Sequence, residues 1–192
     1  ESLSGRMLHI RETAYTELAD GAPAFTVDSQ TDDGAVRTID GTYQVPNFLT
    51  GDGAPGSTFL LDTDGVPQRN TDTPFFTAKF HCVVPIAPPA PVPGIVYGHG
   101  LLGDRTEVDG LGFAATLGMA APCATDEIGM SSEDIGNLAT ILGDLSLFNQ
   151  QADRMQQGIL NEQYMGRLLN SPQGFVSSPA FQSATGTPLI AT

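Results

Sequence analysis

The chain has 192 residues, of which 40% are hydrophobic, so it is long and apolar enough for one domain with a buried core. Its 8 basic and 22 acidic side chains give a net charge of −14, which excludes the basic surface that nucleic-acid binding requires. No apolar run approaches the roughly 20 residues of a membrane-spanning helix, so we predict no membrane span.

Glycine and proline are both frequent, with 22 and 14 residues, and this composition indicates a loop-rich fold of secreted character. The chain begins at Glu1 without a signal peptide, so we expect a processed, trimmed or incompletely recorded polypeptide. Together these features predict a secreted or periplasmic protein.

The first part of the chain, residues 1–74, is predicted to be a β-rich N-terminal region. Residues 6–11 alternate weakly between polar and apolar side chains, as a strand does. Residues 36–46 alternate more clearly and end at a proline, so they are the stronger strand prediction. Turns rich in Asp and Gly follow at residues 51–53 and 62–65.

From residue 75 onward the pattern becomes that of an α/β fold. Residues 75–84 form a predicted strand that is rich in aromatic and β-branched side chains. A proline-rich connection leads to residues 94–97, an apolar run typical of a parallel strand that is buried on both faces. A helix over residues 106–119, N-capped by Thr106, and a strand over residues 120–125 complete a βαβ unit.

A long helical segment, residues 132–170, follows the βαβ unit. Apolar side chains recur along it at helical spacing, namely Ile135, Leu138, Ile141, Leu142, Leu145, Phe148, Ala152, Met155, Ile159, Met165 and Leu169. We interpret this stripe as core packing, with a lid over an apolar site as the alternative. Residues 188–192 could begin a further strand.

Three glycines directly after the apolar strand, Gly98, Gly100 and Gly103, have the G-x-G-x-x-G spacing of dinucleotide-binding loops. Asp126 ends the next predicted strand near the place expected of a ribose-binding acid. However, the predicted helix begins only after Asp104, and an acidic side chain there would repel a pyrophosphate. A nucleotide-binding α/β domain is therefore the alternative interpretation of this loop.

The same loop reads His-Gly-Leu-Leu-Gly from His99 to Gly103. This motif resembles the oxyanion loop of bacterial lipases and esterases of the α/β-hydrolase family, whose backbone N–H groups bind the developing negative oxygen. The resemblance covers residues 75–192. It implies the N-terminal half of an α/β-hydrolase sheet in a secreted bacterial ester hydrolase, preceded by the β-rich region.

By this resemblance the backbone N–H of Leu101 is the oxyanion donor, Gly100 permits the tight turn and His99 braces the loop. An ordinary hydrogen-bonded loop histidine without a catalytic role is the alternative for His99. The whole enzyme would cleave carboxylic esters through an acyl-enzyme, without a cofactor. The substrate is expected to carry an apolar acyl chain, because leucines and the helices rich in Leu and Met flank the site.

The predicted cleft would also be lined by Leu102, Asp126 and Glu127, which lie in the loop and at the end of the next strand. Carboxyl ends of parallel strands are where sites of α/β proteins lie. Capping of the following turn is the alternative role of Asp126 and Glu127.

The catalytic nucleophile is predicted to lie outside this chain. The family requires Gly-x-Ser-x-Gly, and the nearest stretch, residues 129–133, lacks the final glycine. No histidine follows His99, and Ser131 and Ser132 are better explained as helix N-caps. The implied partner is the remaining part of the hydrolase domain, on the same or a second chain, and we expect the 192 residues alone not to form a stable monomer. A non-catalytic secreted binding module, built on the first 80 residues, is a further alternative.

Two cysteines, Cys82 and Cys123, fall on predicted strands that are neighbours in the strand order implied by the resemblance. A disulfide is conceivable if their side chains face each other, and two buried free thiols are the alternative. The cysteines and the three scattered histidines have no metal-ligand spacing, so no metal site is predicted.

Overall fold

The structure is a computed structural model in which residues 3–192 are described. The helices are α1 (Leu3–Leu18), α2 (Gly112–Thr116), α3 (Ile135–Gly143) and α4 (Phe148–Asn170). The strands are β1 (Phe25–Asp33), β2 (Val36–Pro46), β3 (Phe75–Pro85), β4 (Val92–Tyr97), β5 (Ala121–Thr125) and β6 (Ile190–Ala191). Single 3₁₀ segments cover Arg105–Leu111, Ser132–Asp134, Leu145–Leu147, Phe175–Ser177 and Pro179–Phe181.

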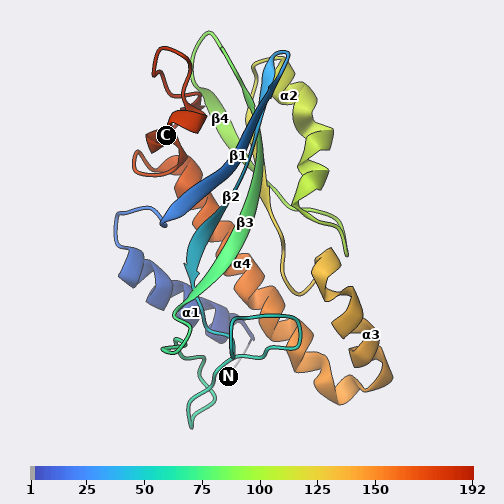
Figure 1. Cartoon of the computed structure of the whole chain (residues 1–192). Coiled ribbons are helices and arrows are strands. Elements are labelled where there is room, and N and C mark those ends of the chain that lie inside the picture. The colour runs from blue at the N-terminus through green and yellow to red at the C-terminus, as the bar shows by residue number, and fades with distance from the viewer. Residues whose placement is uncertain (1–2) are drawn as a thin grey trace.

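The described strands form one mixed sheet in the order β1-β2-β3-β5-β4-β6. The pairs from β1 to β5 are antiparallel, whereas β4 pairs in parallel with both β5 and β6. With helices packed on the sheet, this is an α/β-type fold (Figure 1). The strands β1 and β2, which belong to the segment 1–74, are part of this same sheet.

Each face of the sheet has its own core, because successive side chains of a strand point to opposite faces. On β3, Cys82 and Val84 belong to a large core that includes α4, whereas Val83 belongs to a smaller core that includes Ala115 of α2. Figure 1 agrees with this arrangement, with α2 on one side of the sheet and α1 and α4 on the other. The chain is thus layered as helix, sheet and helix.

The strand β4 differs from the sequence prediction of a strand buried on both faces. Ile95 and Val96 are each 39% exposed, although both are large and apolar. On one side β4 pairs with β5 over Gly94–Tyr97, but on the other side it pairs with β6 only at Val92 and Pro93. Within the described residues, the second edge of β4 is therefore open from Gly94 to Tyr97.

Two further predictions of secondary structure are wrong. Residues 6–11 are not a strand but part of α1, because helical spacing lets Ile10 and Ala14 enter the large core together. The helix predicted over residues 106–119 is a 3₁₀ segment followed by the short α2, and its N-cap is Asp104, not Thr106. Glycines at positions 110 and 112 lower the helix propensity of this segment.

The apolar stripe over residues 132–170 divides into a buried and an exposed part. On α4, Met165 and Leu169 are buried against the sheet, so core packing is correct there and α4 is a layer of the fold. On and after α3, Leu142 and Leu145 are 71% and 69% exposed, so core packing is wrong for these two.

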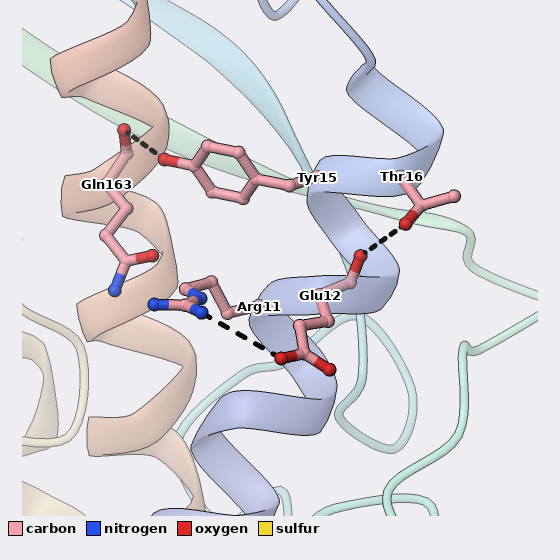
Figure 2. Close-up of a pocket in the computed structure, with 5 residues that line it drawn as sticks. All are labelled: Arg11, Glu12, Tyr15, Thr16 and Gln163. Atoms are coloured by element: carbon pink, nitrogen blue, oxygen red, sulfur yellow. Dashed lines mark hydrogen bonds and ion pairs between the residues drawn. The ribbon is translucent and has the colours of Figure 1, made fainter.

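Hydrogen bonds from tyrosine hydroxyls link α1 to α4. The hydroxyl of Tyr15 donates to the backbone oxygen of Gln163 at 3.3 Å, and that of Tyr164 donates to Ala14 O at 2.7 Å. Figure 2 shows Tyr15 reaching across to α4 above Arg11 and Glu12, where a hollow of about 670 Å³ opens between the helices. No residue of the loop after β4 lines this hollow.

The cysteines Cys82 and Cys123 lie directly opposite each other on β3 and β5 and form a disulfide. Both are fully buried on the face covered by α4. Among the described helices, none has the length and apolar character needed to cross a membrane.

Candidate functional site

The loop after β4 contains a tight turn at the carboxyl end of that strand. Gly103 N donates to Gly100 O at 2.9 Å, so residues 100–103 form a β-turn. Leu102, the third residue of the turn, has φ of 60°, a conformation that glycine adopts more easily than leucine. A strained residue of this kind persists only where the surrounding structure fixes it, and such positions cluster at functional sites.

The loop after β5 holds this turn in place. Leu102 N donates to Met130 O at 2.8 Å, and Ser132 N donates to Gly103 O at 2.7 Å. Behind the turn, the carboxylate of Glu107 accepts the N–H of Gly100 at 2.9 Å. The N–H groups of Gly100, Leu102 and Gly103 therefore all have acceptors.

The N–H of Leu101 is different. In the described part of the chain it donates no hydrogen bond, and the residue is 75% exposed. A backbone N–H that has no acceptor, in a turn that its neighbours hold in place, is a preorganised donor for an external oxygen. The turn can therefore supply one hydrogen bond to a negatively charged or polarised oxygen.

His99 lies buried between the two loops. Its Nε2 accepts the N–H of Glu127 at 2.8 Å, so the proton is on Nδ1, which donates to Gly100 O at 2.8 Å. Both ring nitrogens are thus occupied by backbone groups, and the ring is placed to brace the turn.

Asp126 is buried at the end of β5, and both of its oxygens bind Arg105. Asp126 Oδ1 accepts Arg105 N at 3.0 Å, and Oδ2 accepts Arg105 Nη1 at 2.9 Å. The carboxylate is therefore neutralised by an arginine of the loop after β4 and is not free to bind a ligand.

Glu127 and Glu162 bring two carboxyl groups together beside Gly98. A Cβ placed at Gly98 would lie 2.4 Å from Oε1 of Glu127, which would have to shift, and 3.6 Å from Oε1 of Glu162, which is ordinary contact. Burial, followed by the charge of Glu127 and a hydrogen bond with it, raises the pKa of Glu162 to about 7. Glu162 is not among the site residues predicted from the sequence, although an acidic residue between Ile159 and Met165 of an apolar stripe is a signal for it.

Ser131 belongs to a buried network and is not a nucleophile. Its hydroxyl donates to Asp134 Oδ2 at 2.9 Å, while Asp134 Oδ1 accepts Arg154 Nε at 2.8 Å. Ser131 and Asp134 form a capping box at the start of the helical segment. No hydrogen bond joins a serine to a histidine within residues 3–192.

His81 on β3 lies between two carboxylates. Its Nδ1 is 2.8 Å from Asp40 Oδ1, and its Nε2 is 2.9 Å from Asp109 Oδ1. Burial disfavours the charged ring, but the hydrogen bonds and charges of the two aspartates together outweigh burial and raise the pKa of His81. With both nitrogens occupied, His81 is not placed as a general base.

Neither a protein-family model nor a curated protein matches the sequence. A similar solved structure is that of a Bacteroides fragilis protein that is provisionally described as an acetyl xylan esterase, with a TM-score of 0.47 and 10% identity. The similarity covers 90% of this chain and 44% of that protein, so this chain spans less than half of its length.

Proposed function

We propose that this chain is the first part of a carboxylic ester hydrolase of the α/β-hydrolase type. In this proposal the backbone N–H of Leu101 stabilises the oxyanion, and residues outside the chain supply the nucleophile, the acid and the catalytic histidine. The reaction passes through an acyl-enzyme, in which the serine oxygen bonds to the acyl carbon and the alcohol leaves with a proton.

The free N–H of Leu101 is the observation that carries the proposal. Acyl transfer places negative charge on the carbonyl oxygen, and a fixed backbone donor lowers the energy of that state without reorganising. Glu107, Met130 and Gly100 accept the other three N–H groups of the turn, which fixes its backbone and leaves the N–H of Leu101 as its donor without an acceptor among the described residues.

The open edge of β4 supports the second half of the proposal. An apolar parallel strand normally lies inside a sheet with both faces covered. Ile95 and Val96 remain partly exposed, and β6 pairs with β4 at only two positions. The remaining part of the hydrolase domain would extend the sheet along this edge and cover both side chains.

The surroundings of the turn favour an apolar ester as the substrate. Leu101 is largely exposed beside the open donor, and Met155 and Ile159 line a cavity of about 180 Å³ next to Glu127. The buried disulfide between Cys82 and Cys123 supports an oxidising, secreted or periplasmic, location.

The dinucleotide alternative is opposed by the carboxylates around the glycines. Glu107 lies against Gly103, and Glu127 and Glu162 lie against Gly98, where a pyrophosphate would have to approach. The segment that follows is a 3₁₀ turn and not an α-helix with aligned N–H groups.

Fluorophosphonate labelling of the purified natural protein, followed by intact mass under denaturing conditions, tests the proposed chemistry. We expect the label on a species heavier than 20.1 kDa, or on a second chain beside an unlabelled one of 20.1 kDa. The absence of label on every species would overturn the proposal, because no activated serine would then be present.

A pair of variants of the labelled enzyme tests the role of Leu101. Leu101 is the second residue of a turn whose third residue has positive φ, where proline is well tolerated. Leu101→Pro removes the N–H and keeps the turn, so kcat should fall by about 10²- to 10³-fold. Leu101→Ala keeps the N–H and serves as the control; equal kcat values for the two variants would contradict an oxyanion role.

A further inference from the structure

We propose that Glu162 is a positioning residue of the candidate site, which holds α4 against the carboxyl ends of β4 and β5 by sharing one proton with Glu127. The role of Glu162 in catalysis rests on the proposed function, whereas the proton that it shares with Glu127 can be tested independently of that function.

Three elements meet at this contact. Glu127 directly follows β5, Glu162 lies on α4, and Gly98 directly follows β4. Both carboxyl groups approach Gly98 from the side where its Cβ would be, at 2.4 Å and 3.6 Å from that position. A Cβ at residue 98 would displace the Glu127 carboxylate from this position, so glycine allows that carboxylate to lie where it does.

Two carboxyl groups that line one cavity and lie on the same side of Gly98 repel each other when both are ionised, so a proton shared between them stabilises the pair. The pKa of Glu162, raised to about 7 by burial and by Glu127, agrees with this requirement. At pH 6 the pair carries one negative charge and one hydrogen bond. At pH 8.5 it carries two charges and no hydrogen bond.

Among the described residues that line the cavity beside the pair, none is positively charged. The cavity beside the pair is lined by Ile128, Met130, Met155, Gly158 and Ile159, together with the two glutamates. On the neighbouring elements, Arg105 is bound to Asp126. His99 uses both ring nitrogens on backbone groups, and burial raises the pKa of Tyr43 above its usual range, so its hydroxyl stays neutral.

The contact is coupled to the turn through Glu127. The N–H of Glu127 donates to His99 Nε2, and His99 Nδ1 holds Gly100 O. When the pair ionises fully, repulsion pushes α4 away from Glu127, and the anchor of the turn loosens with it. The rigidity of residues 100–103 is therefore expected to fall as pH rises through about 7.

The proton itself can be followed by ¹³C NMR of the glutamate side-chain carboxyls in the purified natural protein. We expect one resonance to titrate near pH 7, and we expect Glu162→Gln to remove it. Glu127→Gln should move that midpoint towards the ordinary value for glutamate, and the exposed Glu12→Gln should leave it unchanged. If every glutamate titrates below about pH 5.5, the shared proton is refuted.

Hydrogen exchange of the Leu102 and Gly103 amides, corrected for intrinsic base catalysis, tests the positioning role. In the unmodified chain the corrected exchange rate should rise roughly tenfold between pH 6 and pH 8, since full ionisation opens the contact. Glu162→Gln keeps a neutral hydrogen-bonding group and should remove this pH dependence with slow exchange at both pH values. Glu162→Ala should exchange fast at both.

A merely structural Glu162 would give a different result. It would leave the unmodified chain independent of pH and make the Gln and Ala variants alike, and either outcome would overturn the proposal. The NMR and hydrogen-exchange measurements need no nucleophile. They can therefore support the role of Glu162 even if fluorophosphonate labelling fails, and they can refute that role even if labelling succeeds.

Discussion

The imidazole of His99 accepts the backbone N–H of Glu127 at 2.8 Å, and this bond ties the loop after β4 to the loop after β5. His99 is 5% exposed, so both of its backbone partners are bonded at a buried position. We expect His99→Ala to lower the free energy of unfolding by about 1–3 kcal/mol, because two backbone groups lose their partner. Urea denaturation measures this, with His9→Ala on α1 as a control that should change little; equal losses would contradict the bracing role.

Asp134 and Arg154 form an ion pair whose side chains are 2% and 1% exposed. Asp134→Asn leaves the arginine charge buried without a counter-charge, so we expect a loss of about 3–5 kcal/mol in the free energy of unfolding. The neighbouring pair of Glu133 with Lys79 is about half exposed, and Glu133→Gln should cost no more than about 1 kcal/mol. Similar losses in chemical denaturation of both variants would contradict this ranking.

His81 should make stability depend on pH near neutrality. Its pKa is higher in the folded state than the ordinary value, so the folded chain keeps the proton to higher pH than the unfolded chain. The stabilisation is complete below a pH of about 6.5 and is lost as pH rises through the folded pKa.

In thermal melts from pH 5.5 to 9, Tm should therefore fall less with rising pH in the His81→Gln variant than in the chain that keeps His81. The comparison is best made in the Glu162→Gln background, because ionisation of Glu162 also lowers stability as pH rises to about 7. A Tm profile that His81→Gln leaves unchanged would exclude a charged His81.

The open edge of β4 should make the 192-residue chain associate when it is alone. Exposed backbone and apolar side chains at a strand edge favour pairing between copies, and a lysine there opposes it. Ile95→Lys should lower the association seen by sedimentation velocity over a range of concentrations. Leu8→Lys, at an apolar residue of α1 that is 47% exposed, is the matched control. A chain that stays monomeric and melts cooperatively would contradict this expectation.

The strands with the strongest local pattern could be predicted from sequence. Residues 36–46 alternate and stop at a proline, and β2 occupies Val36–Pro46. Residues 75–84 and 120–125 fall on β3 and β5, whose antiparallel register places Cys82 opposite Cys123. In these segments local propensity and tertiary packing favour the same structure.

Other features depend on contacts that periodicity does not contain. Residues 6–11 alternate like a strand, but their place in α1 is decided by packing of Ile10 against the distant core. An apolar run such as residues 94–97 predicts a buried strand but does not identify the elements that bury it. In the structure, part of β4 is exposed to solvent. The partner of Glu162 is 35 positions away, so no local pattern could pair it with Glu127.

The cores on the two faces of the sheet differ greatly in the number of residues that they bury, and this difference affects how the molecule unfolds. The core on the α2 face contains four buried residues, Val83, Val108, Ala115 and Ala124, and α2 itself has only five residues. The opposite core, by contrast, is built on the 23 residues of α4. Layers that bury such different amounts of apolar surface unfold as separate cooperative units. We therefore expect that, in the partly unfolded state of lowest free energy, residues 105–118 are unfolded while the sheet, α1 and α4 remain folded.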